Sequence, residues 1–402
     1  MSQILTKRNS DISIGVIIKN APMNPTIDTL LLAPVKPENA DNKLVPYYDA
    51  EDVATDFDTD SDVYKKAEAY FAEAENGRLD IVKVSNTTVQ VLQATNKPAK
   101  PTDVNAQATN DGAKVTNNLE TTTVDVDGYV AGLIPNLYCG AKYVLMAMPD
   151  YDKTDVAKAK EVKDKYIQSV IAVSNYLYDN QQTILVSAVD NVADLKKIYD
   201  AVAEKVASVS KNRLGNTIIF ANNNAGQFPE VESVAYAISH IPLDWMRIHD
   251  LTGIDSNEWT EAEYAQIMAY NGLTMTNKAG DIVVSNSKAV DGTYIDHTFG
   301  TQYITNAIQV KMQRFLTSTD YLPYDNDGIA LLKAQLESVM TEIGAKGLLV
   351  RENGKPVYSV ITTSRENVAP SDYKNRIYRG TKVTCTLATA IEKVNMTLEI
   401  TK

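Results

Sequence analysis

The last nine residues, 394–402, alternate strictly between apolar and polar side chains. A period of two, without glycine or proline, predicts a β-strand that has one face to bury. The apolar positions of this strand are Val394, Met396, Leu398 and Ile400. A matching alternation near the start of the chain has its apolar positions at Ile12, Ile14, Val16 and Ile18. Because chain ends fray unless they are paired, we predict that both strands pair with strands of the same chain or of a second copy.

Strand and helix patterns alternate regularly in the first two thirds of the chain. The predicted helices are residues 62–75, 155–178, 191–209, 230–239 and 260–270. The predicted strands, which are almost wholly apolar, are residues 30–32, 79–84, 143–148, 183–189, 217–221 and 245–251. Asn191 is expected to cap one helix, and Thr260 forms a capping box with Glu263 before another. This alternation predicts an α/β layer with a largely parallel sheet.

The last third of the chain follows a different pattern, which predicts an α+β unit. Two helices are expected at 301–316 and 328–343, with Asp327 as the N-cap of the second. Further strands are expected at residues 348–350, 356–361 and 383–387, before the terminal strand. The fold class is therefore α/β plus α+β. The predicted units are an arm at 1–20, an α/β domain at 21–290 and an α+β domain at 291–402 that ends in the second arm.

Residues 85–128 interrupt the α/β pattern. They are rich in Thr, Asn, Ala, Asp and Pro, and only short alternations near 89–91 and 124–126 permit weak strands. We interpret them as a peripheral insertion. The sequence Asp125–Gly128 at its end is interpreted as a turn.

Composition and charge narrow the class of protein. With 402 residues, 44% of them hydrophobic, the chain is long enough for two or three domains and a sizeable core. Cys139 and Cys385 show no CxxC spacing, so we expect no disulfide framework, no zinc site and synthesis in a reducing cytosol. No apolar run approaches the roughly 18 residues that a membrane span requires. Residues 1–10 lack the apolar core of a signal peptide, so we expect a soluble protein that is neither inserted into a membrane nor exported by that route.

Charge is distributed unevenly along a chain whose formal net charge is -12. Residues 38–80 contain 13 acidic and 4 basic residues, whereas residues 351–402 contain 9 basic and 5 acidic residues. Two interpretations remain open: two solvated faces, or head-to-tail complementarity between copies, in which opposed patches set orientation. The overall acidity argues against a nucleic-acid partner. The 22 tyrosines against 6 phenylalanines fit either surfaces that are buried on assembly or a bias of composition alone.

The sequence contains few patterns that carry chemistry. It lacks the GxSxG, GxGxxG, GxxxxGKS/T and HExxH motifs, and His240, His249 and His297 show no metal-ligand spacing. We therefore predict no catalytic, cofactor-binding or metal-binding residue, and no enzymatic activity. The alternative is an α/β enzyme with an unrecognised site, for which the polar loop Asn222–Gly226 after a strand is the best place.

One acidic cluster has two interpretations. Its members, at every second position, are Asp56, Asp58, Asp60 and Asp62. A calcium loop begins in this way, but it requires Gly at its sixth position and Glu at its twelfth, where this chain has Ser61 and Ala67. The cluster also precedes a predicted helix, where carboxylates are favoured by capping and by the helix dipole. A structural acidic cap is the preferred interpretation.

Several segments, in their order and spacing, resemble the contractile tail sheath proteins of myophages. The segments are Ala69–Phe71, Asp291–Asp296, Tyr303–Ile304, the helix Ala307–Leu316, Tyr321–Ile329, Ile377–Arg379 and Ala388–Ile391, followed by the terminal strand. They cover parts of the beginning and roughly the last quarter of the chain. The middle matches only in its alternation of strands and helices.

This resemblance implies a structural function. It implies an inner domain built from both chain ends beside a tail tube, and an outer α/β domain. Subunits of this family stack as hexameric rings in a helical array, and their N- and C-terminal arms complete the sheets of neighbouring subunits. Contraction of the array drives the tube through a bacterial envelope.

The expected partners are further copies of the chain, the tail tube protein, and the baseplate and tail terminator proteins. No cofactor and no nucleic acid are expected. The implied location is the virion tail, after synthesis in the host cytoplasm. Two alternatives remain: the sheath of an R-type bacteriocin or another contractile injection system, and a binding module whose terminal strands pair within their own chain.

Overall fold

The computed structural model describes most of the chain between the two predicted arms. The described residues are 28–74, 77–96, 119–137, 139–152, 154–181, 183–209 and 213–392. Both arms, with the apolar positions predicted at 12–18 and 394–400, lie outside the described residues. Their pairing therefore stays a prediction.

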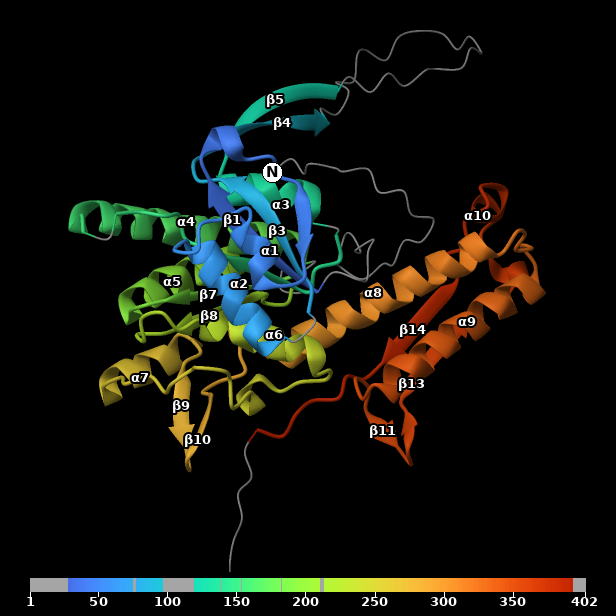
Figure 1. The fold of residues 1–402 in the computed structure, drawn as a ribbon. Coiled ribbons are helices and arrows are strands. Elements are labelled where there is room, and N and C mark those ends of the chain that lie inside the picture. The colour runs from blue at the N-terminus through green and yellow to red at the C-terminus, as the bar shows by residue number, and fades with distance from the viewer. Residues whose placement is uncertain are drawn as a thin grey trace, which may run out of the picture.

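A six-stranded sheet forms the centre of the molecule, with the strand order β2-β3-β1-β6-β7-β8 (Figure 1). Its strands are β1 (Thr29–Val35), β2 (Leu44–Tyr47), β3 (Leu79–Ser85), β6 (Tyr143–Met146), β7 (Ile184–Val189) and β8 (Thr217–Ala221). All neighbours are parallel except β2, which runs antiparallel to β3. Leu31 of β1 lies opposite Ile81 on one side and Leu145 on the other. The predicted, largely parallel sheet is confirmed.

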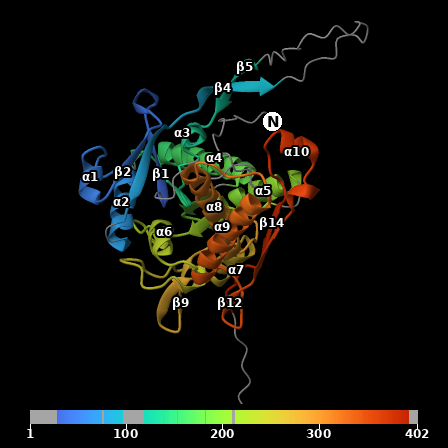
Figure 2. The same ribbon diagram turned by 90° about the vertical axis from the view of Figure 1, so that its right-hand side faces the viewer.

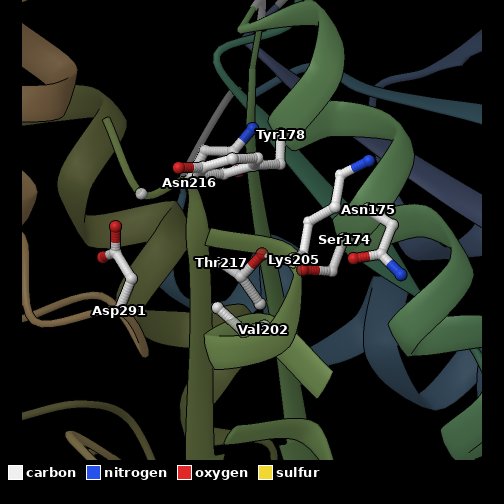
Figure 3. A pocket seen from close by; sticks show the side chains of 9 residues that line it. Ser174, Asn175, Tyr178, Val202, Lys205, Asn216, Thr217 and Asp291 are labelled. Atoms are coloured by element: carbon white, nitrogen blue, oxygen red, sulfur yellow. Dashed lines mark hydrogen bonds between the residues drawn. The ribbon is translucent and has the colours of Figure 1, made fainter. Parts of the chain in front are cut away.

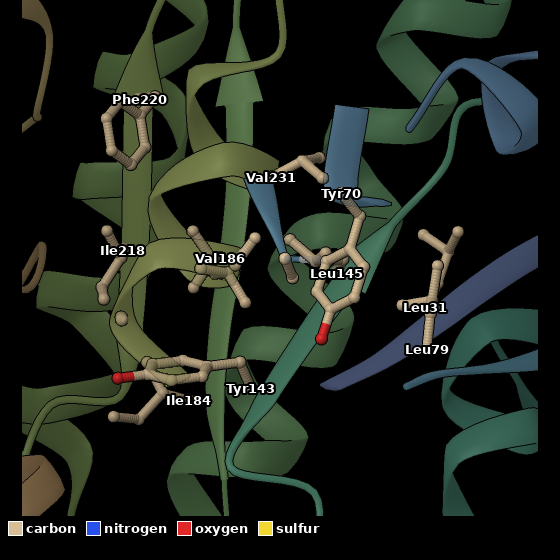
Figure 4. Close-up of a cluster of buried hydrophobic side chains, with 14 of the residues drawn as sticks. Leu31, Tyr70, Leu79, Tyr143, Leu145, Ile184, Val186, Ile218, Phe220 and Val231 are labelled. Atoms are coloured by element: carbon tan, nitrogen blue, oxygen red, sulfur yellow. The ribbon is translucent and has the colours of Figure 1, made fainter. Parts of the chain in front are cut away.

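Helices cover both faces of this sheet, which explains why its strands are apolar throughout. One face packs against α2 (Asp62–Glu73) and α6 (Pro229–Ser239), and Figure 4 shows part of this core. The other face packs against three helices: α3 (Gly128–Asn136), α4 (Val156–Asn180) and α5 (Val192–Ser208). Successive residues of β1 alternate between the two cores, with Leu31 in the first and Leu30 in the second.

Smaller elements surround the sheet. These are η1 (Pro37–Asn39), α1 (Ala50–Ala54), η2 (Trp245–Arg247), α7 (Glu261–Ala269), β9 (Met275–Lys278) and β10 (Asp281–Val284). The predicted caps at Asn191 and at Thr260 with Glu263 are both present. Strands β4 (Val89–Asn96) and β5 (Leu119–Val126) form an antiparallel pair that projects from the body (Figure 1), and they include the positions where the sequence permitted weak strands.

Several local predictions were wrong. Residues 348–350 form no strand, because only Leu349 makes an isolated bridge, to Leu387. Residues 245–251 form no strand: they begin with the 3-10 turn η2, and only His249 makes an isolated bridge, to Val283. These residues are apolar because Trp245, 1% exposed, fills the core beside Tyr143. Asp127 is not part of a free turn but the N-cap of α3. The sequence did not predict α3, because its glycines and Pro135 have low helix propensity.

The last third of the described chain forms a second body, which we call the helix-pair unit. It contains α8 (Ile295–Ser318), α9 (Asn326–Ala345), β11 (Arg351–Glu352), β12 (Lys355–Pro356), β13 (Tyr358–Thr362), η3 (Arg365–Asn367), α10 (Pro370–Lys374) and β14 (Thr381–Cys385). The two long helices extend away from the sheet (Figures 1 and 2). The unit has its own apolar core, in which Leu336, Val339 and Met340 of α9 are buried.

The N-cap of α9 lies two residues before the predicted one. Asp325, not Asp327, accepts a hydrogen bond from the backbone N–H of Gly328, at 2.9 Å. A Cβ at Gly328 would lie 1.9 Å from the carbonyl oxygen of Pro323. The turn between α8 and α9 is therefore tight at this point, and it requires glycine because of close packing rather than an unusual φ.

Candidate assembly interface

A groove of about 1500 Å³ runs along the helix-pair unit between α8, α9 and β14. Its floor is apolar. The apolar side chains that line it include Ile304, Ile308, Met312, Ile329, Leu332, Leu336, Val383, Cys385 and Leu387. The helix residues among them recur every three or four positions, which is the spacing of one apolar face on each helix.

Among the described residues, strand β14 has a strand partner on one edge only, and its other edge lies at this groove. It pairs antiparallel with β13, with Ser359 opposite Thr384, and these two strands form a sheet of their own. Residues of β14 line the groove, whereas none of β13 does. An isolated pair of strands is marginally stable, and an unpaired edge invites another strand. The groove thus combines an apolar floor with an edge of β14 whose backbone donors and acceptors are not paired with any other described strand.

Tyrosine and arginine side chains surround one end of the groove. The ring of Tyr324 meets those of Tyr373 and Tyr378 edge-on, at centroid distances of 5.0 and 6.0 Å, and its hydroxyl donates to the carbonyl of Ile377 at 2.8 Å. Arg365 lies 4.2 Å from the centre of the Tyr373 ring. Burial raises the pKa of the Cys385 thiol on the floor, so this thiol stays protonated at neutral pH.

The chain leaves β14 and crosses to the sheet through a segment that we call the strap, residues 386–392. At its start the N–H of Ala388 donates to the carbonyl of Leu348, at 3.0 Å. At its end Arg247 Nη2 donates to the carbonyl of Ile391 at 2.9 Å, and Ser287 Oγ donates to Glu392. The last described residues, 391 and 392, therefore lie beyond the helix-pair unit, next to Arg247 and Ser287. No sequence pattern pointed to Arg247 or Ser287.

The polar loop singled out by the sequence lies at the carboxyl edge of the sheet, beside a hollow of about 620 Å³. The amides of this loop bond to one another and to neighbours: Asn222 Oδ1 accepts from Asn257 Nδ2 at 2.7 Å, and Asn223 Nδ2 donates to the carbonyl of Glu258 at 2.8 Å. Lys66, which is 5% exposed, pairs with Glu230 at 2.9 Å in the same hollow. These groups hold α2, α6 and the loop together.

A second cavity, between α4, α5 and β8, is much smaller. Its volume is about 10 Å³, and Figure 3 shows Ser174 and Thr217 among its lining residues. The hydroxyls of these two residues lie 2.6 Å apart and bond to each other. A space of this size holds at most about one water molecule, so it offers no room for a substrate.

The acidic cluster of the sequence does not converge on one point. Asp56 accepts from the Tyr47 hydroxyl at 2.6 Å, whereas Asp62 accepts from the backbone of Met148 at 2.7 Å. The N-cap of α2 is Ser61. Among the described residues, no group of three or more His, Cys, Asp or Glu side chains has an arrangement that could hold a metal ion.

Of the comparisons with known proteins, only the one with solved structures found matches. No family model matches the sequence, and no curated protein sequence matches it. A chain of the anti-feeding prophage baseplate superposes with a TM-score of 0.59 at 14% identity, over 99% of this chain and 100% of the other. The helical sheath of the anti-feeding prophage in its contracted state gives a TM-score of 0.56 at 12% identity, over 98% and 99% of the two chains.

The chain has the fold of a contractile sheath protein. A third structure, the contracted sheath complex of the extracellular contractile injection system PVC, agrees with a TM-score of 0.55 at 10% identity, over 99% of this chain and 98% of the other. The resemblance predicted from the sequence is thereby confirmed at the level of the sheath fold, along the whole chain. In the part of the chain that the structure describes, no helix is long and apolar enough to span a membrane.

Proposed function

We propose that this chain is the subunit of a contractile sheath, which polymerises as stacked hexameric rings around a tube and contracts to drive that tube through a bacterial envelope. The sheath fold supports the class of protein. The proposed partners are further copies of the chain, the tube protein, and the baseplate and tail terminator proteins. No catalytic step forms part of the proposal. Both a phage tail and an injection system or bacteriocin fit it, and the genes beside this one distinguish them.

The observation that carries the proposal is the edge of β14 beside an apolar groove, an edge that no other described strand covers. We infer that the arm strand of a neighbouring copy adds to this edge. Its apolar positions, spaced by two, then face the groove floor while its polar positions face outward. The candidate strands are the N-terminal arm with Ile12, Ile14, Val16 and Ile18 and the C-terminal arm with Val394, Met396, Leu398 and Ile400.

Strand exchange of this kind suits an array that changes shape. An arm that binds the groove of the next copy makes a heterologous contact, and such contacts produce helical filaments when they do not close. Main-chain hydrogen bonds along the arm are preserved while the bodies that it connects rotate as rigid units. The free energy released on contraction then lies in the packing between subunits, and a kinetic barrier keeps the extended array in place.

Deletion of residues 395–402 from the full chain tests this proposal. We expect the truncated protein to keep the circular dichroism and the melting temperature of the described body, and to form no rings or cylinders by negative-stain microscopy. Polymers of normal appearance after the deletion would refute the role of the arm.

Two point variants within the arm provide a matched comparison. Leu398→Asp places a charge on the face predicted to contact the groove, and we expect it to abolish polymers. Thr397→Asp places the same charge on the opposite face one residue away, and we expect polymers to form. Equal effects of the two substitutions would contradict the predicted register.

A further inference from the structure

A basic surface lies at the far end of the helix-pair unit, around α10. This basic tip consists of Arg365, Lys374, Arg376, Arg379 and Lys382, all exposed. Residues 363–382 contain these five basic residues and only two acidic ones. Arg379 pairs with Asp372, but within the described chain Lys374 and Arg376 form no ion pair.

The basic tip also has apolar and aromatic surface. Tyr373 is 44% exposed and Ile377 is 41% exposed, next to the unpaired cations. Tyrosine and arginine are enriched at protein interfaces, because they supply contact area together with directed hydrogen bonds. The composition of the tip therefore suits a protein partner that carries negative charge.

An acidic surface lies on the sheet side of the molecule, on α1 and the loop that follows it. This acidic face consists of Asp49, Glu51, Asp52, Asp56, Asp58 and Asp60, all exposed. Residues 49–60 contain no basic residue. Lys83 approaches Asp56 at 3.1 Å, whereas Glu51 and Asp58 form no ion pair among the described residues.

The two surfaces lie on opposite sides of the molecule, with α1 on one side of the view in Figure 2 and α10 on the other. The tip of one copy therefore cannot reach its own acidic face. A contact between the two surfaces joins different copies, and it is head-to-tail because the patches differ.

The predicted arms do not supply the missing negative charge. Residues 1–20 contain three basic residues and one acidic residue, and residues 393–402 contain two basic residues and one acidic residue. Because several tip residues, among them Lys374 and Arg376, also line the groove, an arm bound there adds positive charge beside the tip. The acidic face of a second copy is a surface of this chain that carries the opposite charge.

We propose that the basic tip of one copy docks on the acidic face of a neighbouring copy, as a contact between subunits separate from the arm in the groove. The inference rests on the proposed function, because it assumes an array of this chain. Exposed charges at such a contact set orientation and association rate, and salt screens them over about 10 Å at 0.1 M ionic strength. The contact is thus the salt-sensitive part of the array, and the arm is the salt-resistant part.

A charge-swap experiment on the full chain tests this contact. The tip variant is Lys374→Glu with Arg376→Glu, the face variant is Glu51→Lys with Asp58→Lys, and the swapped variant carries all four substitutions. The control is Lys158→Glu with Lys160→Glu on exposed positions of α4. We expect the tip and face variants each to lose roughly tenfold or more of the polymer that pellets from a low-salt buffer, since like charges then oppose each other. The swapped variant and the control are expected to polymerise as the wild type does.

The results distinguish a failure of the proposed contact from a failure of the proposed function. Wild-type chain that forms no polymer overturns the proposed function, and this contact with it. If the wild type polymerises and the tip and face variants polymerise equally well, the contact alone is overturned. A swapped variant no better than the tip variant overturns the acidic face as the partner. The melting temperature of each variant shows whether it is folded. If the tip variant is unstable, Lys374→Gln with Arg376→Gln replaces it. Polymerisation of that replacement is then expected to depend less on salt concentration than polymerisation of the wild type.

Discussion

Glu232 is a buried carboxyl group without a cation beside it. It is 4% exposed, its Oε2 has no hydrogen-bond partner, and it forms no ion pair with any described residue. Burial, together with the nearby charges of Glu73 and Glu230, raises the pKa of Glu232 to about 8. Lys66 neutralises Glu230 on the same helix, but Glu232 is left to bind a proton. The folded chain therefore keeps Glu232 neutral where the unfolded chain ionises it.

Replacement of this carboxyl group by an amide removes a pH-dependent cost. Because the folded pKa lies above the unfolded value of 4.5, the stability of the wild type falls as the pH rises from about 4.5 to about 8. We expect Glu232→Gln to be close to the wild type at pH 4.5 and to exceed its free energy of unfolding by about 3–5 kcal/mol at pH 8.5, because each unit of pKa difference corresponds to about 1.4 kcal/mol. Urea denaturation at the two pH values measures the difference. Glu68→Gln, at an exposed position of α2, controls for the loss of one carboxylate, and an equal response of both variants would contradict the buried charge.

Individual residues were predictable from the sequence where a local hydrogen bond decides their role. Asn191 and the pair Thr260–Glu263 bond to backbone groups within one helical turn, so their spacing alone indicates a cap. Glu232 offers no such signal, because an acidic residue in the first turn of a helix is also the normal choice for a solvated face. Its burial depends on α2, which is far away in the sequence.

At the scale of elements, most strands and helices with strong periodicity were predicted to within a few residues, although α8 begins at Ile295 instead of 301, and weakly patterned elements were missed. α9 shows an apolar stripe and was found, whereas α3 contains glycines and Pro135 and was missed. Gly128 of α3 packs against β3, and a Cβ there would lie 2.0 Å from the carbonyl oxygen of Ser85. This helix exists because of its tertiary contacts, which a single sequence does not display. Neither the groove nor the edge of β14 was predicted, because both depend on how α8, α9 and β14 pack together.

The free edge and the arm also permit a chemical test. Cys385 lines the groove, so an arm that pairs with β14 brings one of its own inward positions near this thiol. We expect a cysteine at one of the inward positions, Val394, Met396, Leu398 or Ile400, to form a disulfide between copies when polymers are oxidised, because bridged Cα atoms must lie within about 7 Å. Non-reducing electrophoresis then shows a ladder of covalent oligomers.

The control for this cross-link is a cysteine on the outward face of the arm, at Thr397 or Glu399. We expect no ladder from it, and Cys385→Ser must abolish the ladder of the inward variant. Cross-links of equal yield from inward and outward positions would show that the arm does not lie along β14 in the register proposed.

At the scale of the whole molecule, the strap connects the two bodies. Its start bonds to Leu348 in the helix-pair unit, and its end is held by Arg247 and Ser287 beside the sheet. Ala390 also donates to Asp296, at the beginning of α8, over 3.4 Å. The strap therefore fixes the point from which the predicted arm departs, and any rotation between the two bodies moves the arm as well.

Loosening the strap separates its role from that of the arm itself. Arg247→Ala with Ser287→Ala removes the hydrogen bonds at residues 391 and 392, each worth about 1 kcal/mol, while the three apolar cores keep their contacts. We expect amide hydrogen exchange to become faster in a peptide that covers 388–392 and to stay unchanged in β7 and α9, because local opening involves only the strap. Lys196→Ala with Ser208→Ala, at two side-chain hydrogen bonds of α5, serves as the matched control. The variant with Arg247→Ala and Ser287→Ala is expected to polymerise into shorter or less regular cylinders, since its arm starts from a less defined point. Exchange at 388–392 equal to that of the wild type would mean that these two side chains do not hold the strap, and regular, full-length cylinders despite faster exchange would remove the strap from the positioning of the arm.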